Sequence, residues 1–162
     1  MAVRKAKVRG LPADYYAGTD NLSGAALVRS LAGIVARHTD LGYDTARDQL
    51  FANVADTDDD DVVIDIYTGE RLSGIRDRKT ASARNLNTEH TWPQSLGAQG
   101  AARSDLHHLQ PSDIGINGSR SSHPYGMVVD GAPLTFPAVD GQTRIGTDAT
   151  GLTVCEPRPG VR

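Results

Sequence analysis

Apolar residues recur at helical spacing in the first third of the chain. Leu27, Leu31 and Ile34 follow a group of helix-capping residue types at positions 20–23, which predicts an amphipathic helix that ends near Thr39. A second apolar face indicates another helix over about residues 45–54. The first third of the chain is therefore predicted to be helical.

Short β-branched and apolar runs follow after residue 60. The run from Val62 to Tyr67 predicts a strand. Residues 86–93 and 104–109 predict two more strands, joined by a loop rich in glycine and alanine. A short helix that carries Asn117 is expected to follow the last of these strands. This part of the chain is thus predicted to run strand, loop, strand, helix.

The remaining stretches carry few periodic apolar residues. Residues 71–85 are polar and basic, and we expect a loop on the substrate side. From residue 127 to residue 162, glycine, proline and threonine indicate loops with room for one hairpin. A chain of 162 residues fits one domain with its own core. The pattern therefore predicts a single α+β domain over residues 1–162.

Composition limits the chemistry. Cys155 is the single cysteine of the sequence, which excludes an intrachain disulfide and a thiolate-rich zinc cluster. A metal site would use oxygen and imidazole ligands, which favour Mg²⁺, Ca²⁺ or Mn²⁺. Residues 1–10 are basic but lack a following apolar stretch, so they do not form a complete secretory signal. An intracellular protein and one whose signal has been removed both stay open, and no segment approaches transmembrane length.

The formal charge of −3 hides an asymmetry along the chain. Residues 40–69 hold nine acidic side chains and one basic side chain, whereas residues 70–124 hold seven basic and five acidic ones. A polyanionic substrate would be drawn to the second stretch. Ordinary solvated charges explain the same distribution equally well, and both interpretations stay open.

Three short blocks contain the groups that cleavage of a phosphodiester requires. The first places Glu89 directly before His90, the second contains His107 and His108, and the third contains Asn117 and an arginine. A histidine titrates near pH 6.5, roughly, and accepts a proton at neutral pH, while hard oxygen ligands suit a divalent cation. In a regular strand Glu89 and His90 would point to opposite faces, so an irregular strand is needed to bring them together. The order and spacing of the set, rather than any one residue, indicate a reaction site.

The three blocks resemble those of the bacterial endonuclease I family, within the His-Me finger (ββα-metal) nucleases. The matching segments are Asn-Thr-Glu-His-Thr-Trp-Pro at 87–93, Asp-Leu-His-His-Leu-Gln-Pro at 105–111 and Asn-Gly-Ser-Arg at 117–120. The similarity runs from about residue 14 to about residue 125. It implies a ββα-metal finger over about residues 84–123 inside the α+β domain.

The resemblance also implies roles by position. His90 would be the general base that activates water, and His108 would orient the hairpin that presents it. Glu89 and Asn117 would hold one Mg²⁺, whose place Mn²⁺ or Ca²⁺ can take. Two arginines would contact phosphate, one in the third block and one in the loop before the second block: Arg120 and Arg103.

Two features depart from the family pattern. Thr88 stands where relatives often carry arginine, and the loop between the first two blocks is short. Both differences are expected to affect substrate binding more than the chemical step.

Residues 155–162 resemble the start of a family segment that continues into a C-terminal helix. We therefore expect that helix to be missing and its docking surface to be an exposed apolar patch.

The residues and the resemblance together predict a monomeric, Mg²⁺-dependent endonuclease that acts on DNA, with RNA left open and no membrane contact. The candidate groups are directed at phosphate, and the sequence shows no obvious helix that would contact the bases, so we expect little sequence preference. One alternative is a catalytically idle nucleic-acid-binding module, and another is a metal-dependent phosphodiesterase for small nucleotides. The presence of every expected catalytic residue counts against the idle module.

Overall fold

The computed structural model describes residues 14–36, 38–55, 61–137 and 143–161. The chain divides into two compact units, residues 1–40 and residues 41–162. The single domain predicted from the sequence stays a prediction, and the basic N-terminal segment lies outside the described residues. None of the described helices is long and apolar enough to cross a membrane.

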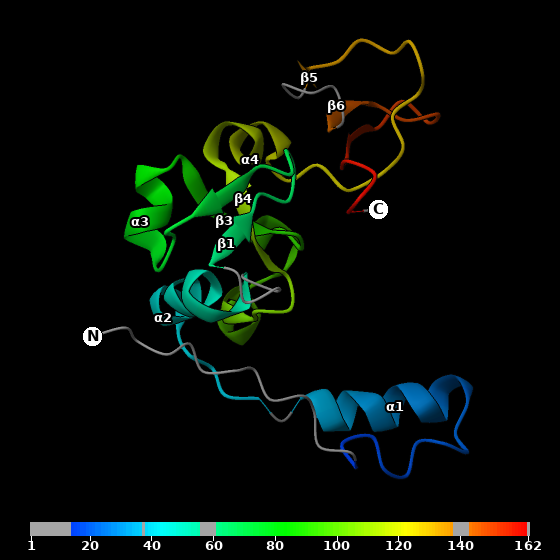
Figure 1. The fold of residues 1–162 in the computed structure, drawn as a ribbon. Helices are drawn as coiled ribbons and strands as arrows, with labels where there is room; N and C mark the ends of the chain where they lie inside the picture. The colour runs from blue at the N-terminus through cyan, green and yellow to red at the C-terminus, as the bar shows by residue number, and fades with distance from the viewer. Residues whose placement is uncertain (1–13, 37, 56–60, 138–142, 162) are drawn as a thin grey trace. The chain divides into compact units, whose positions relative to one another are not determined.

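In its described part, the first unit contains the helix α1 (Gly24–Val35), which confirms the predicted amphipathic helix (Figure 1). Ser23 is the N-cap residue in extended conformation. The helix ends at Val35, about one turn before the predicted end. No residue of α1 is buried, and Leu27 and Leu31 of its apolar face are half-buried.

The second unit begins with α2 (Tyr43–Gln49), which continues into a π-helical turn (Leu50–Val54). These elements confirm the second predicted helix and extend its start to Tyr43. Gly42 precedes the helix with a φ of 70°, a conformation that glycine adopts without strain. Leu50 and Phe51 are buried, so the apolar face lies in the core.

A β-hairpin and a helix follow each other in the centre of the second unit. β3 (Leu86–His90) pairs antiparallel with β4 (Leu109–Asp113), and Glu89 lies opposite Gln110. α4 (Ile114–Arg120) begins directly after β4, because the Asp113 carboxylate accepts a hydrogen bond from a backbone N–H in the first turn, 2.9 Å away. The predicted order of strand, loop, strand and helix is confirmed, and Figure 1 shows β3 and β4 beside α4.

The second strand of this hairpin lies later than predicted. The sequence predicts a strand at residues 104–109, but Asp105 forms a turn in which its carboxylate accepts the backbone N–H of His107 and its carbonyl accepts that of His108. A 3₁₀ helix (Gly100–Ser104) precedes the turn. An aspartate that bonds the backbone two residues on competes with strand pairing, so pairing begins only at Leu109.

The predicted loop over residues 71–85 also contains regular structure, and this prediction was wrong. β2 (Arg71–Ser73) pairs antiparallel with β1 (Val62–Ile64), which is shorter than the predicted strand, and α3 (Arg78–Ala83) follows. Asp77 accepts the backbone N–H of Thr80 at 2.7 Å, while the Thr80 hydroxyl accepts the backbone N–H of Asp77 at 3.0 Å. This capping box begins α3 although the segment is polar.

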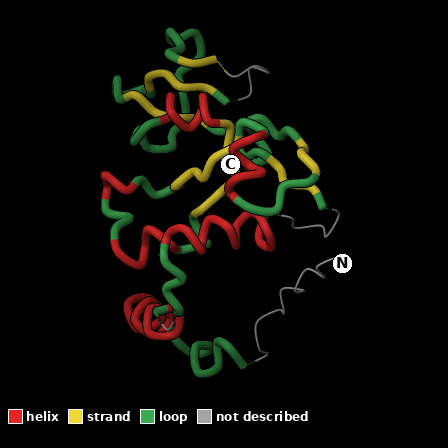
Figure 2. Tube along the Cα trace, turned by 90° about the vertical axis from the view of Figure 1, so that its left-hand side faces the viewer, coloured by secondary structure: helices red, strands yellow, loops and turns green. Residues whose placement is uncertain are grey.

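Beyond α4 the chain forms a three-stranded antiparallel sheet, which is more regular structure than the one hairpin expected. Its strands are β5 (Phe136–Pro137), β6 (Arg144–Thr147) and β7 (Thr153–Glu156). Loops connect these short elements throughout the second unit (Figure 2). The model is thus mixed helix and small antiparallel sheets, as the predicted α+β class requires.

Two buried apolar clusters hold the hairpin and α4. The first joins α2, its π-helical turn, β1, β2 and α3 to Leu86 of β3 and Leu109 of β4. The second joins Ile116 of α4 to Tyr67, to Ile145 of β6 and to the free Cys155 of β7. The start of β3 and the first turn of α4 are therefore anchored in separate parts of the core.

Candidate active site

A cavity of about 430 Å³ lies where β3 ends near α4 and Tyr43 of α2. It is lined by residues from three stretches of the chain: Tyr43, Thr88, Glu89, His90, Pro93, Gln94, Ser95, Asn117, Gly118, Arg120, Ser121 and Ser122. Four of the six predicted site residues are among them: Glu89, His90, Asn117 and Arg120. The other two, His108 and Arg103, do not line the cavity but contact His90.

The imidazole of His90 is held by the loop between β3 and β4. Its Nε2 donates a hydrogen bond to the backbone carbonyl of Arg103, 3.1 Å away. A carbonyl oxygen only accepts, so in the neutral ring Nε2 carries the proton and Nδ1 keeps its lone pair. Burial lowers the pKa of His90, and the nearby His108, Arg103 and Arg47 lower it further, although the Arg103 carbonyl opposes the shift. The free Nδ1 and the lowered pKa of His90 are the features that a proton acceptor requires.

His108 makes the same kind of bond to the same loop. Its Nε2 donates to the carbonyl of Ala102 at 2.6 Å, so the two histidines bind adjacent carbonyls of the 3₁₀ helix. The His108 carbonyl accepts the backbone N–H of Thr91 at 3.0 Å and the Thr91 hydroxyl at 3.1 Å. His107, by contrast, is 95% exposed and pairs with Asp105. His108 is thus the inward-facing member of the pair and links the hairpin to the loop that holds His90.

Glu89 forms a buried ion pair with Arg120. Its Oε1 lies 2.6 Å from Nη1 of Arg120, and the two side chains are 1% and 2% exposed. The hydroxyl of Tyr125 donates to the same oxygen at 3.4 Å. Burial raises the pKa of Glu89, and the positive charge of Arg120 opposes this shift. Glu89 and His90 both line the cavity, so β3 presents a carboxylate and an imidazole there.

Arg120 also binds the backbone at the end of β3. Its Nη1 donates to the carbonyl of His90 at 2.9 Å, and its Nη2 donates to the carbonyl of Thr91 at 3.0 Å. The guanidinium carbon lies 4.7 Å from the centroid of the Tyr125 ring. These contacts hold Glu89 and His90 in place. The phosphate contact that the sequence suggested for Arg120 stays a prediction, and its bonds indicate a positioning role.

Asn117 presents one atom that suits a metal ion. Its Nδ2 donates to Oδ1 of Asn87 at 2.8 Å and to the carbonyl of Thr88 at 3.2 Å, which leaves Oδ1 as a ligand atom. With the Glu89 carboxylate, the cavity offers two hard oxygen donors, and these fit Mg²⁺. No three His, Cys, Asp or Glu side chains of the described residues form a metal cluster. The protein part of such a ligand set is therefore small.

Tyr43 is a further residue of the site, which the sequence did not predict. Its ring lies 5.5 Å from the ring of His90, and the guanidinium carbons of Arg103 and Arg47 lie 4.0 and 4.3 Å from its centroid. Tyr43 and Arg47 are four residues apart in α2, a spacing that places them on one helix face. That spacing could have revealed this pair, but no local pattern links either residue to His90.

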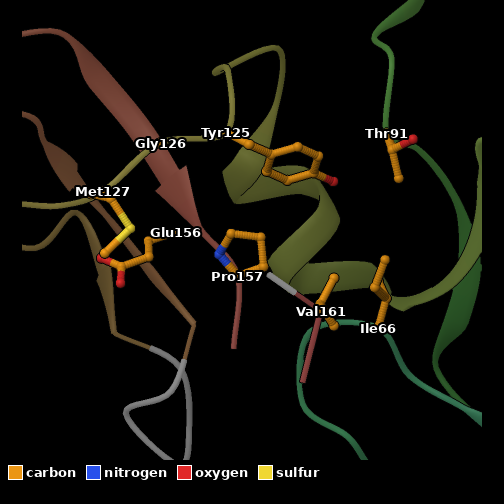
Figure 3. A pocket seen from close by; sticks show the side chains of 8 residues that line it. All are labelled: Ile66, Thr91, Tyr125, Gly126, Met127, Glu156, Pro157 and Val161. Carbon is orange, nitrogen blue, oxygen red and sulfur yellow. The ribbon is translucent and has the colours of Figure 1, made fainter. Parts of the chain in front are cut away.

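A second cavity of about 400 Å³ is bounded by Tyr125 and shares no lining residue with the first. Its walls are mostly apolar, and Figure 3 shows Pro157, Val161 and Ile66 below the Tyr125 ring. Glu156 is the acidic residue of its lining, and no histidine lines it. The cavity that contains His90 is therefore the candidate reaction site.

Comparison with known proteins identifies the family of the chain. The sequence model of the endonuclease I family matches residues 23–160. The chain is 32% identical over 134 residues to an extracellular ribonuclease of Bacillus amyloliquefaciens, a match that covers 78% of this chain and 43% of that protein. It is 31% identical over 111 residues to an extracellular ribonuclease of Bacillus subtilis (strain 168), with 67% and 38% covered. The match thus spans less than half the length of each relative, and no solved structure matches the chain significantly.

Proposed function

Because the chain belongs to the endonuclease I family, we propose that it hydrolyses phosphodiester bonds of nucleic acids with His90 as general base and one divalent metal ion, normally Mg²⁺. The observation that carries the proposal is the hydrogen bond from His90 to the Arg103 carbonyl, which leaves a proton acceptor at the cavity. β3, β4 and α4 would then be the ββα-metal finger, over about residues 84–123.

In this proposal His90 takes a proton from the attacking water through Nδ1. Burial lowers the pKa of His90, so the ring is unprotonated at neutral pH and ready to accept. The Nε2–H bond to Arg103 fixes the ring orientation, and it strengthens when the imidazole becomes positively charged. His108 would act on this step indirectly, because it holds the carbonyl next to the one that His90 uses.

Glu89 and Asn117 would hold the metal ion, with water and phosphate oxygens as its remaining ligands. When bound, Mg²⁺ supplies positive charge that stabilises the charge developing on the phosphate and on the leaving oxygen. Burial raises the pKa of Glu89, and Arg120 opposes this shift and holds the carboxylate in position through their ion pair. Arg103, whose side chain is exposed beside the cavity, would contact a phosphate of the substrate.

The proposed substrates are RNA and DNA. Both relatives are named extracellular ribonucleases, which supports RNA. A base that activates water has no need of the 2′-hydroxyl of RNA, so the same site would also cleave DNA. The candidate residues are directed at phosphate, metal and water rather than at base edges, and we therefore propose little sequence preference.

The test is cleavage of supercoiled plasmid and of a long RNA, with Mg²⁺ and with excess EDTA, by the wild type, His90→Ala and His107→Ala. His107 is the matched control because it is an exposed imidazole in the same hairpin. We expect EDTA to abolish cleavage and His90→Ala to lower the rate about 10²- to 10⁴-fold, as the loss of a general base does. His107→Ala should cleave like the wild type.

Each alternative has its own outcome in the same assay. Retarded migration of the nucleic acid without cleavage would identify an idle binding module. Hydrolysis of a small phosphodiester such as bis(p-nitrophenyl) phosphate, with plasmid and RNA left intact, would identify a small-nucleotide phosphodiesterase. Undiminished cleavage in EDTA would refute the metal ion, and equal rates for His90→Ala and wild type would refute the base.

A further inference from the structure

Tyr43 lies among three groups of the candidate site. Its ring lines the cavity and lies 5.5 Å from the ring of His90. The guanidinium carbon of Arg103 lies 4.0 Å from the ring centroid, and that of Arg47 lies 4.3 Å from it. Both distances are in the range in which the electron-rich face of an aromatic ring attracts a cation.

Arg103 contacts this group twice. Its backbone carbonyl accepts the hydrogen bond of His90, and its side chain packs on Tyr43, which in turn packs against His90. The three residues therefore form a closed set of contacts, although they come from α2, from the end of β3 and from the loop after it. The loss of the Tyr43 ring would release the Arg103 side chain.

The two guanidinium groups on Tyr43 differ in their partners. Arg47 pairs with Asp44 at 2.6 Å, whereas Arg103 has no ion pair within the described part of the chain. A carboxylate would neutralise Arg103 and compete with phosphate for its N–H groups, but an aromatic ring holds a cation and leaves its charge available. The ring thus keeps Arg103 both ordered and able to bind an anion.

We propose that Tyr43 is a positioning residue for the cleavage reaction, which holds the Arg103 guanidinium beside the cavity where a substrate phosphate binds. The inference rests on the proposed function, since it assigns how that site grips its substrate. It also gives the ring a role other than base stacking, because the guanidinium groups lie over the ring. Through Arg103, Tyr43 would then contribute to binding of the phosphate backbone, which is common to RNA and DNA.

The experiment is a double-mutant cycle with the full chain on RNA and on plasmid DNA. The variants are Tyr43→Leu, Arg103→Gln and the two combined, with Tyr43→Phe as the conservative variant that keeps the ring. We expect Tyr43→Leu to raise KM about 2- to 5-fold with little change in kcat, the size that a cation–π contact gives. Tyr43→Phe should retain the wild-type KM, and Tyr43→Leu should have no further effect when Arg103 is already glutamine.

A second readout separates positioning from a loss of structure. The dependence of KM on monovalent salt should weaken by about one released ion in Arg103→Gln, and part of that loss should appear in Tyr43→Leu. If Tyr43→Leu does not fold, Tyr43→Met takes its place with the same expected results, because methionine fills a similar volume with a more adaptable side chain. Arg47→Gln is the matched control, since it removes the guanidinium that is already paired with an acid.

An equal effect of Tyr43→Leu in the wild type and in Arg103→Gln would overturn this inference, and so would a Tyr43→Phe variant as impaired as Tyr43→Leu. A wild type that cleaves neither RNA nor DNA would instead refute the proposed function. The two failures are therefore distinguishable, because the double-mutant cycle compares each variant with a wild type that must itself be active.

Discussion

The guanidinium of Arg120 and the carboxylate of Glu89 form a buried ion pair of 2.6 Å between α4 and the end of β3. The partners are 31 residues apart in the sequence, and both side chains are almost fully removed from water. Through two further bonds Arg120 also holds the carbonyls of His90 and Thr91. One side chain of α4 thereby fixes three consecutive residues, from Glu89 and His90 of the candidate site to Thr91 just after β3.

Arg120→Ala is expected to lower the free energy of unfolding by about 3–5 kcal/mol, because it leaves the Glu89 carboxylate buried without a counter-charge. Urea denaturation measures the change. Arg84→Ala, which removes an exposed guanidinium, is the control and should change stability by no more than about 0.5 kcal/mol. If the two variants were equally stable, the pair would not contribute to the native state in solution.

The pKa of His90 is expected to lie below the ordinary value of about 6.5, because burial disfavours the charged ring. Below this pKa the ring holds a proton on both nitrogens and cannot accept another. The proton-accepting form is therefore lost as the pH falls through the lowered pKa, and it is fully present at pH 7. An NMR titration of the imidazole signals in the metal-free protein measures the value, and a midpoint above 6.5 would contradict the prediction.

Asn117→Ala is expected to raise the Mg²⁺ concentration for half-maximal activity about 10-fold or more, on the order seen when metal-site groups are removed. The stabilisation of the protein by Mg²⁺ in a thermal melt should decrease in parallel, which gives a readout independent of activity. Asn53→Ala removes an amide that bonds Gln49 within one helical segment and does not line the cavity. An identical Mg²⁺ response of both variants would exclude Asn117 as a ligand.

The basic stretch after residue 70 is expected to act in two ways. Arg78 pairs with Asp44 and Asp48, so Arg78→Glu should lower the melting temperature because these pairs connect α3 to α2. Lys79 and Arg84 are exposed, and their reversal to glutamate should raise KM more than it lowers kcat and should weaken the salt dependence.

Thermal melts and kinetics at several salt concentrations check both expectations. Arg29→Glu, an exposed charge reversal in α1, is the control for an unspecific effect of net charge. The same rise in KM for Arg29→Glu as for Lys79→Glu would show that net charge alone is responsible. A stable Arg78→Glu variant with a raised KM would instead place Arg78 on the substrate.

The sequence by itself determined the elements whose signals are local. Periodic apolar residues predicted α1 and α2, and the β-branched run predicted the start of β1. The periodicity of apolar side chains and helix capping both act within one or two turns of the chain, so they can be recognised in the sequence without the tertiary structure. The order and spacing of the three blocks also selected Glu89, His90 and Asn117, which line one cavity.

Tertiary structure alone decided how these residues are held. The Asp105 turn moved β4 beyond its predicted position, and the burial of Arg120 paired its guanidinium with Glu89, a partner that the sequence did not predict. The contacts of His90 with Arg103 and with Tyr43 join residues that are 13 and 47 positions apart. Pairing across such distances depends on which elements pack together and which charges lose their water, and no local periodicity encodes either.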